Sequence, residues 1–477
     1  MFHTFINAKN ILLKEDQNAS TVKIAVWYII GNLFAKGVVM VSTPVFTRLL
    51  SKNEYGQFSN LVSWESIIVV FATLDFATSI TRAKYDFERR MNRYVSSILL
   101  FSNFVTLAIL FSIEINQDFF VKLFSMDIIY IRMLFIYLLF TPAFSYLQIK
   151  HRVYKKYKFF VLFSISSAII RTFISVILVL TMTDKLLGRI YGYFLPVTLF
   201  NLILWLVILA EGKGISWDCI KYACKISIPL IPHTLSSIVL GNSDRIMITK
   251  YCGSESTALY SLAYTISTMA SLLWTSMNQA WSPWLFDKMN DKNTREISDK
   301  SKIYLDVFFV LIIGVLLVTP EIILILGGKS YYSARYIMPP VIAGCTFQFI
   351  YGMYVNIEVF SKKTFAISIG TTAAATINIF LNRLFIPKYG YMAAAYTTMF
   401  GYFVLLAFHY CMVKVKIKEY SNIYNESHIF LIMLLNIVTG ILSLILYKHN
   451  YIRYSLVFMY SVIILLVMLN MIKYKTK

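Results

Sequence analysis

The sequence predicts an all-α membrane protein of about fourteen transmembrane helices, in two six-helix lobes related by an internal repeat and followed by two C-terminal helices. Three observations predict this fold. The 477-residue chain is 58% hydrophobic and only 14% charged, which excludes an ordinary soluble protein. Apolar runs of about 20 residues, enough to cross a bilayer, recur along the whole chain. A stretch in the second half also repeats the pattern of one near the N-terminus.

The expected elements follow these apolar runs in order. Residues 1–23 are expected to form a short cytoplasmic segment. Spans 1–6 form an N-lobe (24–210), spans 7–12 form a C-lobe (226–413), and spans 13 and 14 lie within 428–472. The individual spans are expected at 24–47, 59–80, 94–113, 128–149, 159–182, 190–210, 226–249, 258–281, 303–326, 336–360, 364–386, 391–413, 428–447 and 451–472.

The distribution of positive charge supports this order. The chain has 45 lysines and arginines and a net charge of +21. Cytoplasmic loops of membrane proteins carry an excess of these residues. With the N-terminus inside, most of them fall in the inner segments, so both termini are expected in the cytoplasm. The charge is therefore a topology signal, and we expect no nucleic-acid partner.

The internal repeat relates residues 227–267 to a region near the N-terminus. At a shift of 202 residues, Lys23-Ile24 falls under Lys225-Ile226, and Thr47-Arg48 under Thr249-Lys250. The identities are few, so a chance match is the alternative. The shared order of helix, short loop, helix and charged loop favours two homologous halves, an architecture common among transporters.

The sequence offers no site for enzymatic chemistry. No expected loop exceeds roughly twenty residues, so there is no soluble domain. A G-x-x-x-x-G-K-[ST] phosphate loop is absent, as is any Ser/His/Asp or paired-carboxylate arrangement. The five cysteines show neither C-x-x-C nor metal-ligand spacing. We expect no enzyme, no cofactor and no metal site, and energy for any transport must come from gradients or from another protein.

Deep cations predict a polar cavity. Lys36 and Arg171 each lie twelve residues from a span end, about 18 Å along a helix. This depth is too great for the side chain to reach the headgroups, so each must pair with an acid or face water. We expect both to point into a water-accessible lumen between the lobes. Arg245 lies only about 7.5 Å from Lys250, and reaching the outer interface is an equally good explanation for it.

Amide and acidic residues complete the candidate site. Asn32, Gln279 and Asn378 lie on polar stripes with helical spacing, which indicate either a wet surface or hydrogen-bonded helix contacts. Several stripes with embedded cations favour the wet surface. The candidates for ion coupling or gating are Glu65, Asp75, His233 and Asp244.

Some of these candidates have simpler explanations. Asp75 lies near an inner span end and could pair with Arg82. His233 lies between Pro229 and Pro232 and could fill a bend. Glu65 and Asp244 lack a cation on their own helix face, which makes them the better coupling candidates.

Two short motifs resemble a known family. The run Ser243-Asp244-Arg245-Ile246-Met247-Ile248 and the later run from Ala258 to Tyr264 (ALYSLAY) are similar to the central stretch of bacterial polysaccharide-biosynthesis flippases. Arg48-Leu49-Leu50 and the run from Glu54 to Phe58 (EYGQF) resemble the matching signature of the first half. These flippases are the Wzx-type O-antigen and capsule repeat-unit translocases of the multidrug/oligosaccharidyl-lipid/polysaccharide superfamily.

The resemblance implies alternating access around a cationic cavity, in the bacterial inner membrane. The implied substrate is an oligosaccharide on undecaprenyl pyrophosphate, moved from the cytoplasmic to the periplasmic leaflet for O-antigen or capsule synthesis. Membrane lipid, a polysaccharide polymerase and a chain-length regulator are the implied partners. Asp244 and Arg245 fall on the family motif, whereas Lys36 and Arg171 match none and rest on depth alone.

Other functions are weighed against this one. A drug/cation antiporter of the same superfamily would favour an anionic cavity, and a lipid II flippase would carry a similar anionic substrate. A membrane polymerase or ligase would need a large periplasmic loop, and a structural scaffold would not need cations deep in the membrane.

Overall fold

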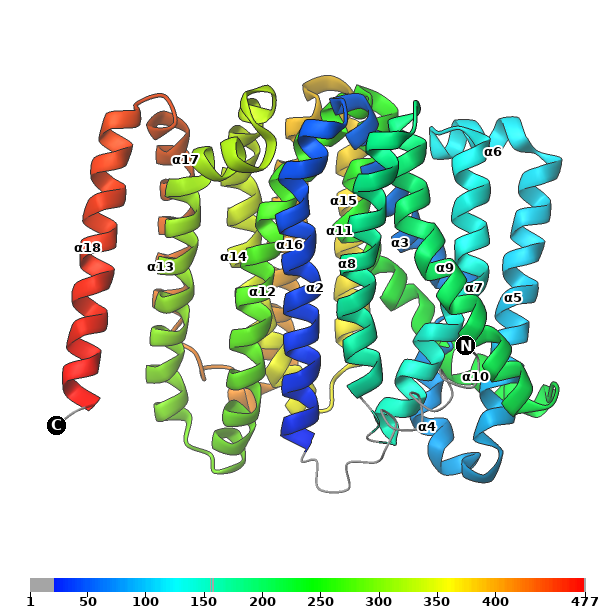
Figure 1. Cartoon of the computed structure of the whole chain (residues 1–477). Helices are drawn as coiled ribbons and strands as arrows, with labels where there is room; N and C mark the ends of the chain where they lie inside the picture. The colour runs from blue at the N-terminus through cyan, green and yellow to red at the C-terminus, as the bar shows by residue number, and fades with distance from the viewer. Residues whose placement is uncertain (1–20, 155, 157, 476–477) are drawn as a thin grey trace. The chain divides into compact units, whose positions relative to one another are not determined.

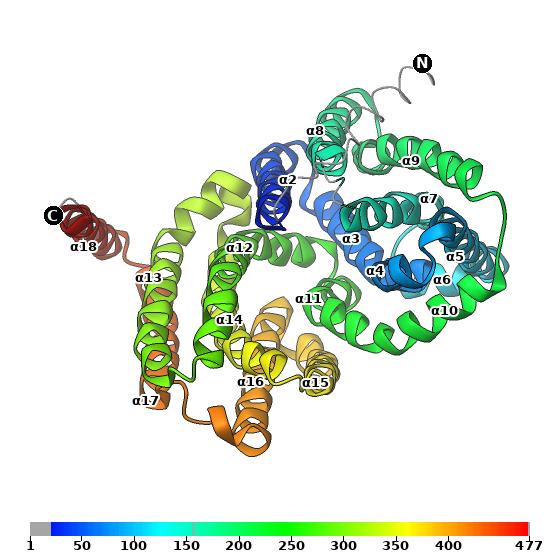
Figure 2. The ribbon, with the colours of Figure 1, turned by 90° about the horizontal axis from the view of Figure 1, so that it is seen from below.

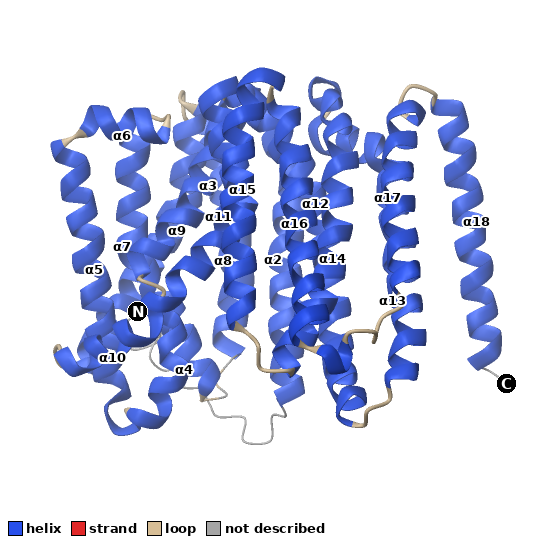
Figure 3. Cartoon of the chain, turned by 180° about the vertical axis from the view of Figure 1, so that it is seen from behind, coloured by secondary structure: helices blue, strands red, loops and turns tan. Residues whose placement is uncertain are grey.

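The computed structural model describes residues 21–154, 156 and 158–475, so most of the predicted segment 1–23 lies outside the described residues. This part of the chain contains helices and connecting loops but no strand (Figure 3). The α-helices are α2 (Thr21–Leu49), α3 (Lys52–Thr73), α4 (Ala77–Asp86), α5 (Met91–Ile115), α6 (Gln117–Phe124), α7 (Ile128–Val153), α8 (Lys158–Thr181), α9 (Lys185–Gly212), α10 (Trp217–Ser227), α11 (Ile231–Cys252), α12 (Ser254–Asn290), α13 (Thr294–Gly327), α14 (Met338–Phe360), α15 (Phe365–Tyr389), α16 (Tyr391–Lys416), α17 (Glu426–Leu446) and α18 (Asn450–Lys475).

The helices are those of a multi-pass membrane protein. Among the described residues, 10 helical stretches are long and apolar enough to cross a membrane. They cover ten of the predicted spans, and the other four coincide with α2, α12, α14 and α18. Many large apolar side chains of these helices are exposed, as a lipid environment requires. The prediction of an all-α membrane protein is confirmed.

The chain forms two compact units, residues 1–258 and 259–477. In the first unit, α2 packs on α8, α8 on α9, and α7 on both α5 and α9 (Figures 1 and 2). α11 packs along α3 in this same unit, although the sequence assigned its residues to the C-lobe. Apolar side chains such as Tyr94, Tyr146 and Phe160 form one of its cores.

A capping box and a glycine fix the start of α3. The Ser51 hydroxyl accepts a 3.2 Å hydrogen bond from the Glu54 backbone N–H, and the Glu54 carboxylate accepts one of 2.7 Å from the Ser51 N–H. One turn later, a Cβ atom at Gly56 would lie 1.8 Å from the backbone oxygen of Ser254. The first-half signature EYGQF therefore marks a close backbone contact with the turn between α11 and α12.

Two predicted spans are interrupted. The second, expected at 59–80, breaks between α3 and α4, where Leu74 and Asp75 both adopt a left-handed φ of 49°. The seventh, expected at 226–249, begins with a 3₁₀ turn at Ile228–Leu230 between α10 and α11. Pro229 lies in that turn and Pro232 in the first turn of α11, where neither proline interrupts an α-helix.

In the second unit, α14 packs on α16 and α17, α15 on α16, and α13 on α17 (Figure 2). α18 contacts α13 through a buried arginine. Arg453, with 1% of its surface exposed, donates hydrogen bonds of 2.5 and 2.6 Å to both carboxylate oxygens of Glu321. Such a bidentate pair offsets the cost of placing both charges among apolar helices.

Candidate functional site

A cluster of charged and aromatic side chains lies inside the first unit. Arg171, on α8, donates a 3.1 Å hydrogen bond from Nη2 to the Tyr137 hydroxyl of α7. Its guanidinium carbon lies 4.6 Å from the centroid of the Tyr193 ring of α9 and 5.5 Å from that of Tyr137. Cation–π contacts of this kind stabilise a desolvated arginine.

Glu65, on α3, is the acidic member of this cluster. Its carboxylate interacts electrostatically with Arg171 and lies near the hydroxyl groups of Tyr137 and Tyr193. Arg171 was expected to pair with an acid or to face water, and within the first unit it interacts with an acid. The expectation that Glu65 lacks a cation holds only for its own helix, because its partner comes from α8.

Arg189, on α9, is a member that sequence reasoning missed. Its guanidinium carbon lies 3.6 Å from the ring centroid of Phe46, 4.4 Å from that of Phe58 and 5.8 Å from that of Tyr193. The predicted span began at residue 190 and left Arg189 in a loop. The helix in fact begins at Lys185, because the Asp184 side chain caps it by accepting a 2.9 Å hydrogen bond from the Leu187 N–H.

The cluster has unused hydrogen-bonding capacity. The cluster contains two arginines and one carboxylate, so it carries an excess positive charge. The buried Nε atoms of Arg171 and Arg189 and the Oε2 atom of Glu65 have no hydrogen-bond partner among the described residues. Arginine donors in a partly desolvated site favour an anion with several oxygen acceptors, such as a phosphate group.

The family-motif residues Asp244 and Arg245 lie on α11. Asp244 is buried, with 1% of its surface exposed. Arg245 is half-buried and donates a 3.0 Å hydrogen bond from Nη1 to the side chain of Asn242 one turn earlier. The two side chains therefore lie in different environments, as expected for neighbours along a helix.

Asp75 and His233 lie where the first unit's helices are interrupted. The Thr234 hydroxyl of α11 donates a 3.0 Å hydrogen bond to the Asp75 carboxylate, which accounts for this acid better than the suggested pairing with Arg82. Arg82 instead forms an ion pair with Asp86, in which Arg82 Nε lies 3.4 Å from Asp86 Oδ2. His233 is half-buried, and its Nδ1 atom is buried without a hydrogen-bond partner in the described chain.

The remaining candidates differ in their exposure. Lys36 has an exposed side chain on α2, whereas the side chain of Asn32 lies outside the described residues. Gln279 is exposed on α12. Asn378 is fully buried between α15 and α16, where its side-chain amide donates a 3.0 Å hydrogen bond to Thr398. Helix–helix contact, the alternative explanation, accounts for Asn378 better than a wet surface.

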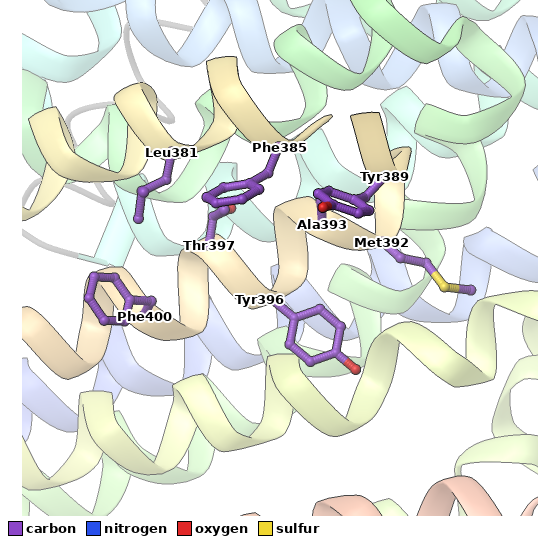
Figure 4. A pocket seen from close by; sticks show the side chains of 8 residues that line it. All are labelled: Leu381, Phe385, Tyr389, Met392, Ala393, Tyr396, Thr397 and Phe400. Atoms are coloured by element: carbon purple, nitrogen blue, oxygen red, sulfur yellow. The ribbon is translucent and has the colours of Figure 1, made fainter. Parts of the chain in front are cut away.

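Two cavities within single units differ in chemistry. One of about 550 Å³ lies on α15 and α16, and aromatic and aliphatic side chains dominate its lining (Figure 4). It contains no charged residue, so it suits an apolar chain and not a phosphate. The other, of about 570 Å³, lies in the first unit at the ends of α5, α7 and α9 and is rich in arginine and lysine. Within the described chain, no group of His, Cys, Asp and Glu side chains could hold a metal ion.

The fold and site together define a multi-pass membrane protein with a cationic cluster between its helices. The polysaccharide biosynthesis protein family matches residues 21–289, more than half of the chain. The chain belongs to this family. Among curated proteins, none matches it in sequence.

Solved structures show the same fold. The chain is similar to the lipid II flippase MurJ in an inward closed conformation, with a TM-score of 0.65, 16% identity, and coverage of 91% of this chain and 100% of that one. It is also similar to an inward-facing multidrug resistance MATE transporter of the MOP superfamily (TM-score 0.57, 12% identity, coverage 82% and 94%). A mutant of the Vibrio cholerae MATE transporter VcmN gives a TM-score of 0.53 at 11% identity, with coverage of 87% and 100%.

Proposed function

We propose that this protein is a flippase that moves oligosaccharide repeat units, linked to undecaprenyl pyrophosphate, from the cytoplasmic to the periplasmic leaflet of the bacterial inner membrane. It would work by alternating access, with both termini in the cytoplasm, and would supply O-antigen or capsule synthesis. The family match supports a role in polysaccharide biosynthesis. The cationic cluster around Arg171 and Arg189 is the observation that supports a substrate with a phosphate-containing headgroup.

The physical problem of this transport is the pyrophosphate. Burying an unpaired ion in a low-dielectric medium costs on the order of tens of kcal/mol by Born estimates. Arginines that are already held among helices, by Tyr137, Tyr193 and Phe46, supply hydrogen-bond donors without a further desolvation cost. The lipid tail would remain in the bilayer while the headgroup crosses, and a polymerase and a chain-length regulator would receive the product.

Glu65 would couple this step to an ion. A phosphate and the Glu65 carboxylate compete for the same arginine, Arg171. When the substrate binds, the carboxylate loses its cation in a low-dielectric site and would take up a proton from water. Release of the substrate would restore the Glu65–Arg171 pair and return the proton. Lys36 and Arg245 remain further candidates for binding the headgroup, and Asp244 for coupling.

Complementation tests the proposal in two bacterial strains. We expect expression of this chain to restore surface polysaccharide in a strain lacking its repeat-unit flippase, provided that the sugar is accepted. The fold similarity to MurJ makes lipid II the second candidate substrate. Restored growth of a strain depleted of its lipid II flippase, without restored polysaccharide in the first strain, would favour that alternative.

A matched arginine serves as control. Arg132, at the edge of the same unit, forms an exposed 2.7 Å ion pair with Glu114. Exposed pairs contribute only about 0–1 kcal/mol, so Arg132→Ala should retain complementation. Arg171→Gln should lose it. Equal polysaccharide levels with both variants, at equal membrane levels, would remove the cluster from the mechanism.

A further inference from the structure

A second pair of titratable groups lies fully buried in the second unit. Glu358, on α14, and His409, on α16, both have 0% of their surface exposed, and His409 Nδ1 lies 2.8 Å from Glu358 Oε1. The other polar atoms of the pair, Glu358 Oε2 and His409 Nε2, are also buried and have no hydrogen-bond partner among the described residues. Half-satisfied polar pairs are costly among apolar helices, so packing alone does not explain this one.

The unpaired nitrogen of His409 faces the backbone of α15. A Cβ atom at Gly370 would lie 3.2 Å from His409 Nε2 and 2.6 Å from Phe408 Cδ1. On the other side, the Tyr351 ring of α14 stacks on the imidazole, with centroids 5.7 Å apart and an interplanar angle of 20°. Because Gly370 has no side chain, the imidazole edge packs directly against the backbone of α15.

The charged groups on the surrounding helices have partners of their own. Lys414 of α16 pairs with Glu426 of α17, and Tyr410 also donates a hydrogen bond to that carboxylate. His428 of α17 lies 2.9 Å from Asp306 of α13. On α13, Glu321 pairs with Arg453. The Glu358–His409 pair is therefore separate from these ion pairs.

A cavity of about 400 Å³ lies beside the pair. Its lining includes Lys362, Lys363 and Lys416, on the side that the charge distribution predicts to be cytoplasmic. It also includes Phe408, which directly precedes His409, and Ile369, which directly precedes Gly370. Phe408 and His409 Nε2 both lie against Gly370, so water in this cavity would come close to the unpaired nitrogen of His409.

We propose that the Glu358–His409 pair is a proton-binding site, which exchanges protons with the cytoplasm through this cavity. An ionised carboxylate only accepts hydrogen bonds, so His409 Nδ1 carries the proton that it shares with Glu358. The second proton comes from water in the cavity and binds at Nε2, which converts the imidazole to an imidazolium beside the carboxylate. No other bond forms or breaks.

Protonation would also change helix packing. With a proton, Nε2 becomes a hydrogen-bond donor that faces the α15 backbone at Gly370, and the described chain offers it no acceptor. A buried unsatisfied donor costs about 1–3 kcal/mol, which favours a shift of α15 against α16. The site would therefore couple proton binding to a rearrangement in the second unit, whatever substrate the protein carries.

Histidine titration tests the proposal directly. The full-length protein, with isotope-labelled histidine and in lipid nanodiscs, would be titrated by NMR from about pH 5 to pH 9, the range of histidine ionisation. We expect a signal that is lost in His409→Gln and that titrates in this range. In Glu358→Gln the pH dependence of this signal should change, because a neutral amide replaces the carboxylate beside the imidazole.

A matched exposed pair provides the control. His428 Nε2 lies 2.9 Å from Asp306 Oδ1, close to the 2.8 Å between His409 and Glu358, but the side chains of His428 and Asp306 are 21% and 50% exposed. Because water screens that pair, Asp306→Asn should move the His428 midpoint much less. Should His409→Gln prove unstable, the double variant Glu358→Gln/His409→Gln, with two amides that can bond to each other, assigns the signal. A His409 signal that stays constant across the range, or whose midpoint ignores Glu358→Gln, would overturn the proposal.

Discussion

The Thr234 hydroxyl donates a 3.0 Å hydrogen bond to the Asp75 carboxylate, and this bond joins the two places where helices of the first unit are interrupted. Asp75 lies in the left-handed break between α3 and α4, and Thr234 lies just after the 3₁₀ turn that precedes α11. Nearby, the hydroxyl groups of Thr78 and Ser227 are 3.1 Å apart. Two breaks that are bonded to each other can bend together, which suits a transporter that changes conformation.

This contact predicts a loss of stability. In Thr234→Val the Asp75 carboxylate loses a donor, and a hydrogen bond to a charged group contributes about 1.5–3 kcal/mol. We expect the apparent melting temperature of the purified protein to fall by a few degrees. Thr181→Val is the control, because that exposed hydroxyl bonds only to the Ile177 and Leu178 carbonyls of its own helix. An equal effect of both variants would show that the contact between the two breaks contributes nothing.

The glycine of the EYGQF motif predicts a packing defect. In Gly56→Ala the new methyl group would overlap the backbone oxygen of Ser254, and a backbone cannot move aside as a side chain can. The amount of folded protein in the membrane should therefore fall severely. Gly241, on α11 of the same unit, has no atom within 4 Å of its would-be Cβ, so Gly241→Ala should leave that amount unchanged. Measurement of both variants by fluorescence-detected chromatography decides the matter.

The Glu65–Arg171 interaction predicts that structure and transport can be separated. Arg171→Gln alone removes the cation that interacts with Glu65, and a buried carboxylate left uncompensated is destabilising. Membrane levels should fall in this variant. Glu65→Gln/Arg171→Gln removes both charges and should recover much of the membrane level but not the surface polysaccharide. Recovery of both would assign the pair a structural role only.

Topology gives a further prediction. The charge distribution places both termini inside, so reporter fusions after residue 255 should report the periplasm and those after residue 292 the cytoplasm. Residue 255 follows the turn between α11 and α12, and residue 292 lies between α12 and α13. A reversed result at either site would contradict the predicted order of fourteen spans.

The sequence predicted the helices better than the contacts between them. Hydrophobic runs identified each long helix, because the bilayer requires about 20 apolar residues whatever the neighbours are. The break at Leu74 and Asp75 was missed, since leucine rarely adopts a left-handed conformation and a single aspartate does not predict one. Arg189 was missed because a cap one turn earlier set the start of its helix.

Partners on other helices lay beyond sequence reasoning. Helical periodicity fixes which side chains share a face of one helix, but not which helix packs against it. Glu65 therefore seemed to lack a cation on its own helix face, and Asp75 was matched with Arg82 although its hydrogen-bond donor is Thr234. For the same reason, a stripe of amides on α15 did not reveal whether Asn378 faces water or the α16 hydroxyl of Thr398.

Reconstitution provides the measurement of flipping itself. The purified protein would be placed in liposomes with a lipid-linked oligosaccharide, and a membrane-impermeant glycosidase would report the fraction of headgroups that reach the outer leaflet. Wild-type protein should expose the inner-leaflet pool over time. Glu65→Gln/Arg171→Gln should do so at least about tenfold more slowly, since a charged hydrogen bond contributes about 1.5–3 kcal/mol. No exposure beyond that of protein-free liposomes, or equal rates for both proteins, would contradict the account of a flippase built on this cationic cluster.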